Sequence, residues 1–215
     1  MLNIELFSGI QESDMLSLLR CLDIQTKNYK KNSAIIQFNS KISSIGIVLD
    51  GSVEVVREDI SGDIVTVGKL KENGIFGEAL VCANIEKSPI SVIASSKCEI
   101  LFIPYEKVIA PCQNACYFHK QLVKNILKVI SRKNLDLNLQ IDLLGKRTTK
   151  EKLLTYLRTQ MAETGNNKFF IPLNRNELAE FLCVDRSAMS RELCSLRDEG
   201  IIKFNKNYFE MNENE

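Results

Sequence analysis

The segment Leu173–Gly200, LNRNELAEFLCVDRSAMSRELCSLRDEG, has the pattern of two short helices joined by a turn. Asn174, followed three residues later by Glu177, resembles a capping box, and an apolar stripe comes directly after it. Asp185 stands where it can cap the second helix. The segment therefore predicts a helix-turn-helix.

The second helix of this pair has an apolar side and a polar side. Its apolar residues Met189, Leu193 and Leu196 are spaced to face inward. The opposite side carries side chains that can reach the base edges and phosphates of DNA, namely Arg186, Ser187, Ser190 and Arg191. Every amphipathic helix has a polar face, so this face alone also fits an ordinary solvated surface.

The residues after Gly200 strengthen the DNA-binding interpretation. Two apolar runs, Ile201–Phe204 and Tyr208–Met211, flank the polar turn Asn205–Asn207 and predict a two-stranded hairpin. Two helices followed by such a hairpin form a winged helix-turn-helix.

Composition limits the possible classes of protein. The chain has 215 residues, 45% of them hydrophobic, which suits a globular protein with one or two cores. The formal net charge is only +1, so any nucleic-acid binding must come from local placement of charge. No apolar run is long enough to span a membrane and no signal peptide is apparent, which predicts a cytoplasmic protein.

The region from about Tyr29 to Ile103 has a different pattern, in which short apolar runs alternate with polar turns. Asp50-Gly51 is a strong hairpin signal between two of these runs. A spacing of about ten residues predicts a small antiparallel β-barrel or sandwich. The expected strands are Ala34–Phe38, Ser44–Leu49, Ser52–Arg57, Ile64–Leu70, Ile90–Ala94 and Glu99–Ile103.

Helices are predicted on both sides of this β-rich region. An amphipathic helix is expected at about Gln11–Leu22, and a long one at about Ala115–Leu144. The long helix has an apolar heptad seam in which an Asn at an a position favours a parallel pair. The seam consists of Val123, Leu127, Ile130, Asn134, Leu137, Ile141 and Leu144. A second stripe, Leu122, Ile126 and Val129, could pack on the β domain.

The seam has two interpretations. It predicts a coiled-coil homodimer, and it is also compatible with a single helix buried within its own domain. After it, Gly145–Arg147 forms a hinge, and Thr148 with Glu151 forms a capping box for a helix that ends near Gly165. The predicted domains are residues 1–110 (β-barrel sensor), 111–144 (dimerisation helix) and 145–215 (winged helix-turn-helix). The predicted fold class is therefore α+β.

This order of parts resembles the transcription factors of the Crp/Fnr family, named after the cyclic-AMP receptor protein and the fumarate-nitrate regulator. Leu49–Val55 is similar to the family's hairpin, and Gly77-Glu78-Ala79 is similar to the start of its phosphate cassette. The most specific match is Val184–Leu193, which resembles the family's recognition helix. A jelly-roll domain of the cyclic-nucleotide-binding type is therefore implied.

The resemblance implies a role for each polar residue of the second helix. Arg186, Ser187, Ser190 and Arg191 would contact bases and phosphates, with Arg191 the best candidate for reading guanine. The expected partners are a palindromic double-stranded DNA site and a second copy of the chain, with RNA polymerase a further candidate. One departure is Cys183, which stands in the turn where many helix-turn-helix motifs have Gly.

The resemblance also implies an effector pocket, at Gly77, Glu78, Ala79, Lys87 and Ser88. The family's cyclic-nucleotide binders use Glu for the ribose hydroxyl and an Arg-Ser pair for the phosphate. This chain has Lys87-Ser88-Pro89 instead, and Lys lacks the planar fork of Arg. Pro89 removes a backbone donor, and the family's adenine-contacting Thr-Ser pair is absent from Lys133–Leu144. Weak or absent cyclic-AMP binding is therefore expected, and the effector is unknown.

The cysteines suggest no disulfide framework, because seven of them are scattered along a chain without an apparent signal peptide. Only Cys21 lies near the N-terminus, so no iron–sulfur cluster of the Fnr type is expected. Cys112, Cys116 and His119 could share one side of a helix and bind a soft metal or act as a thiol switch. The ordinary alternative is that Cys116 packs against the barrel while His119 is exposed.

These observations favour a homodimeric, sequence-specific, effector-responsive transcription regulator. The alternative is an effector-, redox- or metal-sensing module whose helical C-terminal domain mediates protein contacts. No enzyme is expected, because the sequence has one His, no nucleophile–base constellation and no phosphate loop.

Overall fold

The computed structural model describes residues 4–58, 63–110 and 117–212, and these form two compact units. The first unit runs to Arg132 and the second begins at Lys133, so the division falls within the long helix α4 (Tyr117–Gly145). Each unit has its own apolar core, and each is described separately below.

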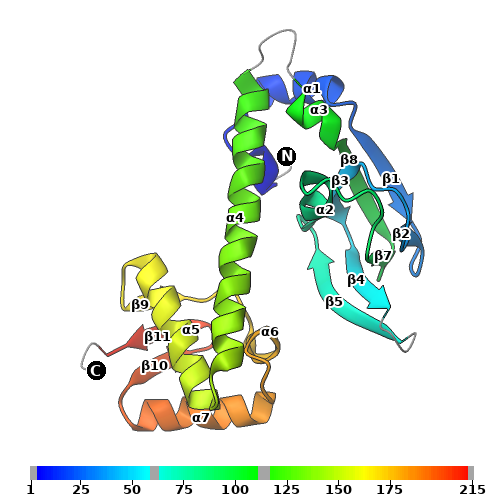
Figure 1. The fold of residues 1–215 in the computed structure, drawn as a ribbon. Helices are drawn as coiled ribbons and strands as arrows, with labels where there is room; N and C mark the ends of the chain where they lie inside the picture. The colour runs from blue at the N-terminus through cyan, green and yellow to red at the C-terminus, as the bar shows by residue number, and fades with distance from the viewer. Residues whose placement is uncertain (1–3, 59–62, 111–116, 213–215) are drawn as a thin grey trace. The chain divides into compact units, whose positions relative to one another are not determined.

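Two four-stranded antiparallel sheets form the centre of the first unit (Figure 1). One sheet has the order β1-β8-β3-β6 and the other β2-β7-β4-β5. Their bounds are β1 Gln25–Tyr29, β2 Ala34–Ile36, β3 Ser44–Asp50, β4 Ser52–Glu58, β5 Ile64–Lys71, β6 Ile75–Phe76, β7 Ser91–Ala94 and β8 Cys98–Pro104. The predicted β-rich domain is confirmed with one difference, since the described strands form two separate sheets and no closed barrel.

The reason for two sheets is that β3 and β8 are apolar on both faces. Along β8, Cys98 and Ile100 are buried in a cluster shared with Val53 and Val92 of the second sheet. The alternate residues, such as Leu101, are buried in a different cluster that includes the helices. Because successive side chains of a strand point to opposite faces, this sheet packs against the second sheet on one face and against the helices on the other.

The helices of the first unit cover the outer face of the β1-β8-β3-β6 sheet. They are the 3₁₀ helix η1 (Glu5–Phe7), α1 (Glu12–Cys21), α2 (Glu78–Cys82), α3 (Tyr105–Ile109) and the first part of α4. The predicted second stripe of the long helix is confirmed, because Leu122, Ile126 and Val129 are all buried in this core.

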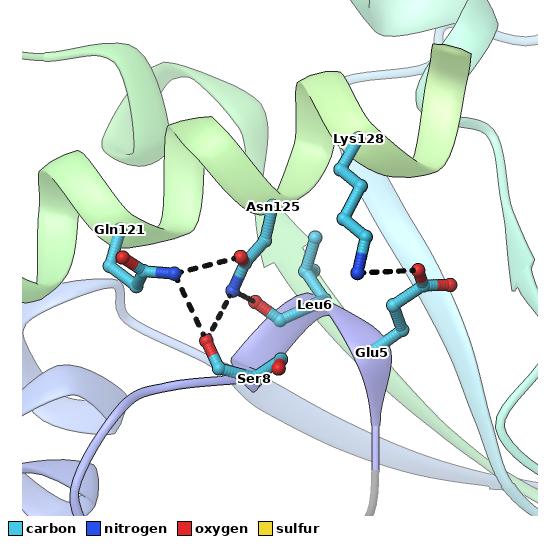
Figure 2. A network of polar contacts seen from close by, with 6 residues as sticks. All are labelled: Glu5, Leu6, Ser8, Gln121, Asn125 and Lys128. Carbon is cyan, nitrogen blue, oxygen red and sulfur yellow. Dashed lines mark hydrogen bonds and ion pairs between the residues drawn. The ribbon is translucent and has the colours of Figure 1, made fainter. Parts of the chain in front are cut away.

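A polar contact network fixes the N-terminal segment to α4 (Figure 2). The buried Asn125 donates from Nδ2 to the carbonyl oxygens of Leu6 and Ser8, each at 2.8 Å. Gln121 donates from Nε2 to Asn125 Oδ1 at 3.0 Å and to the Ser8 carbonyl at 3.3 Å. Because the buried carbonyl group of Leu6 needs a donor, the network sets where the segment can lie on the helix.

The second unit contains three helices and a three-stranded sheet. The helices α5 (Thr149–Thr164), α6 (Arg175–Phe181) and α7 (Arg186–Asp198) share one core with the end of α4, where Leu143 is buried. The sheet has the order β10-β11-β9, from β9 (Lys168–Phe170), β10 (Ile202–Asn205) and β11 (Tyr208–Met211). The predicted helix-turn-helix and hairpin are therefore both present, and the hairpin gains a third strand.

We predict that Asn125→Ala destabilises the first unit by about 1–3 kcal/mol, because the buried Leu6 carbonyl loses the donor Asn125 and the Ser8 carbonyl keeps only Gln121. The measurement is urea denaturation followed by far-ultraviolet circular dichroism. Lys128→Ala is the control, since its contact with Glu5 spans 3.7 Å between largely exposed side chains and should contribute less than about 1 kcal/mol. Equal effects of the two substitutions would contradict the role given to Asn125.

Candidate nucleic-acid interface and effector pocket

The first helix of the helix-turn-helix begins at a complete capping box. Asn174 Oδ1 accepts hydrogen bonds from the backbone N–H groups of Asn176 and Glu177, at 2.9 and 3.1 Å. Glu177 Oε2 in return accepts from the Asn174 backbone N–H at 3.0 Å. These bonds satisfy donors at the helix start that would otherwise lack partners, and they confirm the predicted start of α6.

The turn between α6 and α7 has a left-handed residue at Cys183, whose φ is 51°. The Val184 N–H donates to the Ala179 carbonyl at 3.0 Å and the Cys183 N–H to the Glu180 carbonyl at 3.1 Å. This closure is the usual helix end at which Gly is preferred, because a Cβ is strained at positive φ. Cys183 therefore keeps the usual turn geometry at a cost in conformational energy.

Asp185 caps the recognition helix α7. Its Oδ1 accepts from the Ala188 backbone N–H at 2.9 Å and from the Ser187 hydroxyl at 2.5 Å. The pKa of Asp185 is lowered by the Ser187 hydroxyl first and by the Ala188 N–H second, and Arg191 adds a favourable charge. The carboxylate is therefore stabilised in its charged form, which accepts hydrogen bonds best.

The two faces of α7 are as predicted. Met189, Leu193 and Leu196 are buried in the core of the unit. The polar residues Arg186, Ser187, Ser190 and Arg191 are all exposed.

The exposed arginines of α7 remain available for a ligand. Among the described residues, neither Arg186 nor Arg191 forms an ion pair, whereas Arg197 near the other end of α7 pairs with Asp198 at 2.9 Å. Ser190 donates its hydroxyl to the Arg186 carbonyl at 2.9 Å, so its oxygen is left mainly as an acceptor. This face thus presents two arginines that form no salt bridge with a described carboxylate, a combination suited to phosphate and guanine.

Arg175 links the first helix of the motif to the wing. The sequence analysis did not predict this contact. Its guanidinium lies over the rings of Phe204 and Phe209, with distances of 5.0 and 5.1 Å to the ring centroids. Burial lowers the pKa of this guanidinium. In the part of the chain that the structure describes, Nη1 and Nη2 have no hydrogen-bond partner, so ring contact is the main interaction of this group.

One of the five predicted effector residues, Lys87, lines a cavity in the first unit. A cavity of about 570 Å³ in the first unit is lined by Lys87, together with Ile42, Val81, Tyr105 and other residues, but not by Gly77, Glu78, Ala79 or Ser88. Gly77 has a φ of 80° and precedes α2, on which Glu78 is buried. Lys87 is exposed, whereas Glu78 is buried.

Ser88 is buried and its donors are already used. Its hydroxyl donates to the Ile90 carbonyl at 2.7 Å, and its backbone N–H donates to the Ser40 carbonyl at 2.9 Å. Pro89 has no N–H to contribute. A phosphate at this position would have to displace bonds within the protein.

Of the three residues predicted to bind a metal or act as a thiol switch, the structure describes only His119. Cys112 and Cys116 lie outside the described residues. His119 is buried, which differs from the exposed position expected in the ordinary alternative, because it lies near the start of α4 next to Phe118 and faces Cys21 of α1. The described residues contain no group of three or more Cys, His, Asp or Glu placed to hold a metal ion.

The fold and the exposed face of α7 define a regulator with a ligand-binding type of β domain and a helix-turn-helix. Residues 26–114 match the model of the cyclic nucleotide-binding domain, and residues 151–212 match that of the Crp-like helix-turn-helix domain. The chain belongs to the Crp/Fnr family of transcriptional regulators, which are not enzymes.

Named proteins that are similar in sequence or structure support this family assignment. The chain is 23% identical over 186 residues to a global nitrogen regulator of Nostoc sp., covering 84% of this chain and 82% of that one. It is 22% identical to the transcriptional activator protein FnrA of Stutzerimonas stutzeri, covering 81% and 71%. The crystal structure of the catabolite activator protein of Thermus thermophilus matches with a TM-score of 0.55 at 21% identity, covering 97% and 94%. No helix among the described residues is long and apolar enough to cross a membrane.

We predict that Cys183→Gly stabilises the second unit by roughly 1 kcal/mol, because Gly adopts a positive φ without strain. Thermal unfolding followed by circular dichroism measures the change. Cys183→Ala is the matched control, since it removes the thiol but keeps the Cβ, and it should leave stability near that of the original chain. A gain of the same size in both variants would assign the effect to the thiol instead of the turn.

Proposed function

We propose that this Crp/Fnr-type regulator acts as a homodimer that reads a palindromic DNA site with one α7 helix from each subunit. The observation that carries the proposal is the exposed face of α7, where, within the described ranges, neither Arg186 nor Arg191 forms a salt bridge. We assign the sensor to residues 1–110, the dimerisation helix to 111–144 and the DNA-binding domain to 145–215.

The dimer is inferred from α4. Among the seam residues, Leu127, Leu137, Ile141 and Leu144 have between 57% and 67% of their surface exposed in the single chain. Four large aliphatic side chains at heptad spacing are costly to leave in water, and a second copy of the same helix would cover them. Asn134 is exposed on the same seam, where pairing with its own copy would favour a parallel register.

A parallel dimer has a geometric consequence for DNA. Two recognition helices related by a twofold axis reach successive major grooves when they are about 34–36 Å apart. Arg191 is proposed to read guanine, while Arg186, Ser187 and Ser190 contact bases or phosphates nearby. Because the net charge of the chain is only +1, recognition of the DNA sequence is assigned to the residues on this face of α7.

The effector is proposed to be a small molecule other than cyclic AMP. The buried Ser88, whose N–H and hydroxyl are both used within the protein, supports this, as does the exposed Lys87 in place of Arg. Effector binding would shift the population between DNA-ready and DNA-averse dimers. A cytoplasmic location and a contact with RNA polymerase complete the proposal.

A second candidate function keeps the effector domain but assigns the helical C-terminal domain to protein contacts. The exposed polar face of α7 could serve either purpose. The DNA-binding measurement below separates the two, because a protein-contact module would not distinguish one DNA sequence from another.

We predict that Arg191→Ala lowers affinity for the specific DNA site by about 1–3 kcal/mol per half-site, since one bidentate guanine contact is lost. Fluorescence anisotropy with a site selected from random DNA measures the loss. Arg197→Ala is the control on the same helix, because its guanidinium is paired with Asp198, and it should bind nearly as before. Equal binding by both variants would favour the protein-contact function.

We predict that Leu137→Glu shifts the chain from dimer to monomer, because it buries a charge in the seam of the paired helices. Analytical ultracentrifugation measures the shift. Leu135→Glu is the control, because Leu135 is 67% exposed on the same helix but lies outside the seam. Monomers of the original chain at micromolar concentration would contradict the dimer.

We predict that cyclic AMP produces no saturable heat in titration calorimetry at micromolar concentrations, because Ser88 has no donor left for the phosphate. The competing result is a dissociation constant in the micromolar range, which would return cyclic AMP as the effector. The titration is run on the 215-residue chain, with the same buffer injected as a blank.

A further inference from the structure

Two lysines stand directly opposite each other at the cavity of about 570 Å³ in the first unit. Lys41 precedes β3 and Lys87 follows α2, and the two residues form an isolated antiparallel bridge. Residues opposed in this way have Cβ atoms about 4.5–5.5 Å apart on one face, where like charges are destabilising. The fold therefore holds two positive charges together at one cavity.

The charges of these two lysines are not compensated by the described part of the chain. Neither Lys41 nor Lys87 forms an ion pair or a side-chain hydrogen bond with any residue in that part. Glu86 and Glu106 line the same cavity, but neither of them forms an ion pair with a described residue. Because opposite charges attract over a few ångströms, an anion in the cavity would offset the repulsion between the two ammonium groups.

Backbone hydrogen bonds fix the segments that carry the two lysines. The Asn39 N–H donates to the Ser88 carbonyl at 2.8 Å, and the Ser88 N–H donates to the Ser40 carbonyl at 2.9 Å. The Tyr105 N–H donates to the Ser43 carbonyl at 3.0 Å, which joins the same segment to the start of α3. An anion therefore does not have to order this part of the backbone when it binds, and the entropic cost of binding is lower.

The rest of the cavity has an apolar wall with a few polar groups. Its aliphatic residues are Ile42, Val81, Ile85 and Ile109, and its polar residues include Asn84 and Tyr105. Ile85 and Ile109 are 40% and 56% exposed, so apolar surface is left for a ligand to cover. The volume lies within the range of about 300–1,000 Å³ that is typical of small-molecule sites.

We propose that this cavity binds a small phosphate monoester, with the phosphate between the ammonium groups of Lys41 and Lys87. A phosphate monoester carries about −1.5 to −2 charge at pH 7 and three acceptor oxygens on one atom, so a single group can meet both lysines. Lysine binds phosphate as a point charge, which requires no planar fork. The carboxylates of Glu86 and Glu106 disfavour further negative charge, so the remainder of the ligand is uncharged or cationic.

Such a ligand would be the effector of the proposed regulator, so its regulatory role rests on the proposed function. Lys87 was expected in the effector pocket from the family resemblance, whereas Lys41 and the cavity come from the structure alone. Ser88 does not line this cavity and its donors are used within the protein, so the phosphate is assigned to the lysine pair instead.

The test is titration calorimetry of the 215-residue chain with phenyl phosphate, in a buffer of low ionic strength at about pH 8, where the monoester is doubly charged. We expect saturable binding near one equivalent per chain. Benzoate, which has the same ring but a single negative charge, should bind at least tenfold more weakly. Absence of saturable heat with millimolar phenyl phosphate, or equal binding of benzoate, would overturn the proposal.

Lys41→Gln and Lys87→Gln test the lysine pair directly. Each should weaken binding of phenyl phosphate at least tenfold, because one of the two positive charges is lost. Each also removes the repulsion between the lysines, so the melting temperature without ligand should stay the same or rise. Weaker binding together with a lower melting temperature in both variants would indicate damage to the fold and contradict the site.

Lys31→Gln is the matched control, because Lys31 is an exposed lysine of the same unit that does not line the cavity. It makes the same change in net charge and should bind phenyl phosphate as the original chain does. Undiminished binding in both cavity variants, or an equal loss in Lys31→Gln, would contradict the site. None of these titrations contains DNA, so their failure would leave the DNA-binding proposal standing, and a failure of DNA binding would leave this site standing.

Discussion

The burial of one stripe of α4 is the interaction on which the rest of the structure depends. Leu122, Ile126 and Val129 pack into the core of the sensor unit, and Leu143 at the other end packs into the core of the DNA-binding unit. Burying side chains of this size contributes about 1.5–3 kcal/mol each. With one stripe fixed in this way, the seam residues Val123 and Ile130 also lie partly against this core, and the remaining aliphatic seam residues, Leu127, Leu137, Ile141 and Leu144, are left exposed.

The same helix thereby connects the two functional regions of the chain. Its first part contacts the N-terminal segment through Asn125, and its end joins the core that supports α7. The proposed dimer places the seam of each subunit against the other. Effector binding that alters the packing of α4 in the sensor unit would then bias the spacing of the two recognition helices, which is how a change at one site can alter binding at another.

Sequence patterns predicted most of this fold because regular spacing reports burial. The capping box at Asn174 and the two faces of α7 follow from local residue patterns and are confirmed by the structure, whereas the pairing of two heptad seams stays a prediction. The strand β1 was missed because QTKNY is polar and mostly exposed, and β6 was missed because it has only two residues. The separation into two sheets depends on contacts that no local pattern reports.

The contacts that sequence reasoning missed join residues far apart in the chain. Asn125 is polar within an apolar stripe, so its carbonyl partners at Leu6 and Ser8 could not be inferred from spacing. Arg175 over the wing rings and Cys21 beside His119 are likewise products of the tertiary fold. Conversely, the DNA-contacting roles of Arg186 and Arg191 come from the family resemblance and stay predictions.

The most direct test of the central claim is binding to DNA sites with altered half-site spacing. A selected palindrome is compared with versions that have five or ten extra base pairs inserted at its centre. A dimer held rigidly by α4 predicts half-sites about 10–10.5 base pairs apart, and the five-base-pair insertion should reduce affinity to the non-specific level. Affinity that does not depend on the spacing would contradict the account, because it would mean that the two recognition helices are not held at a fixed distance.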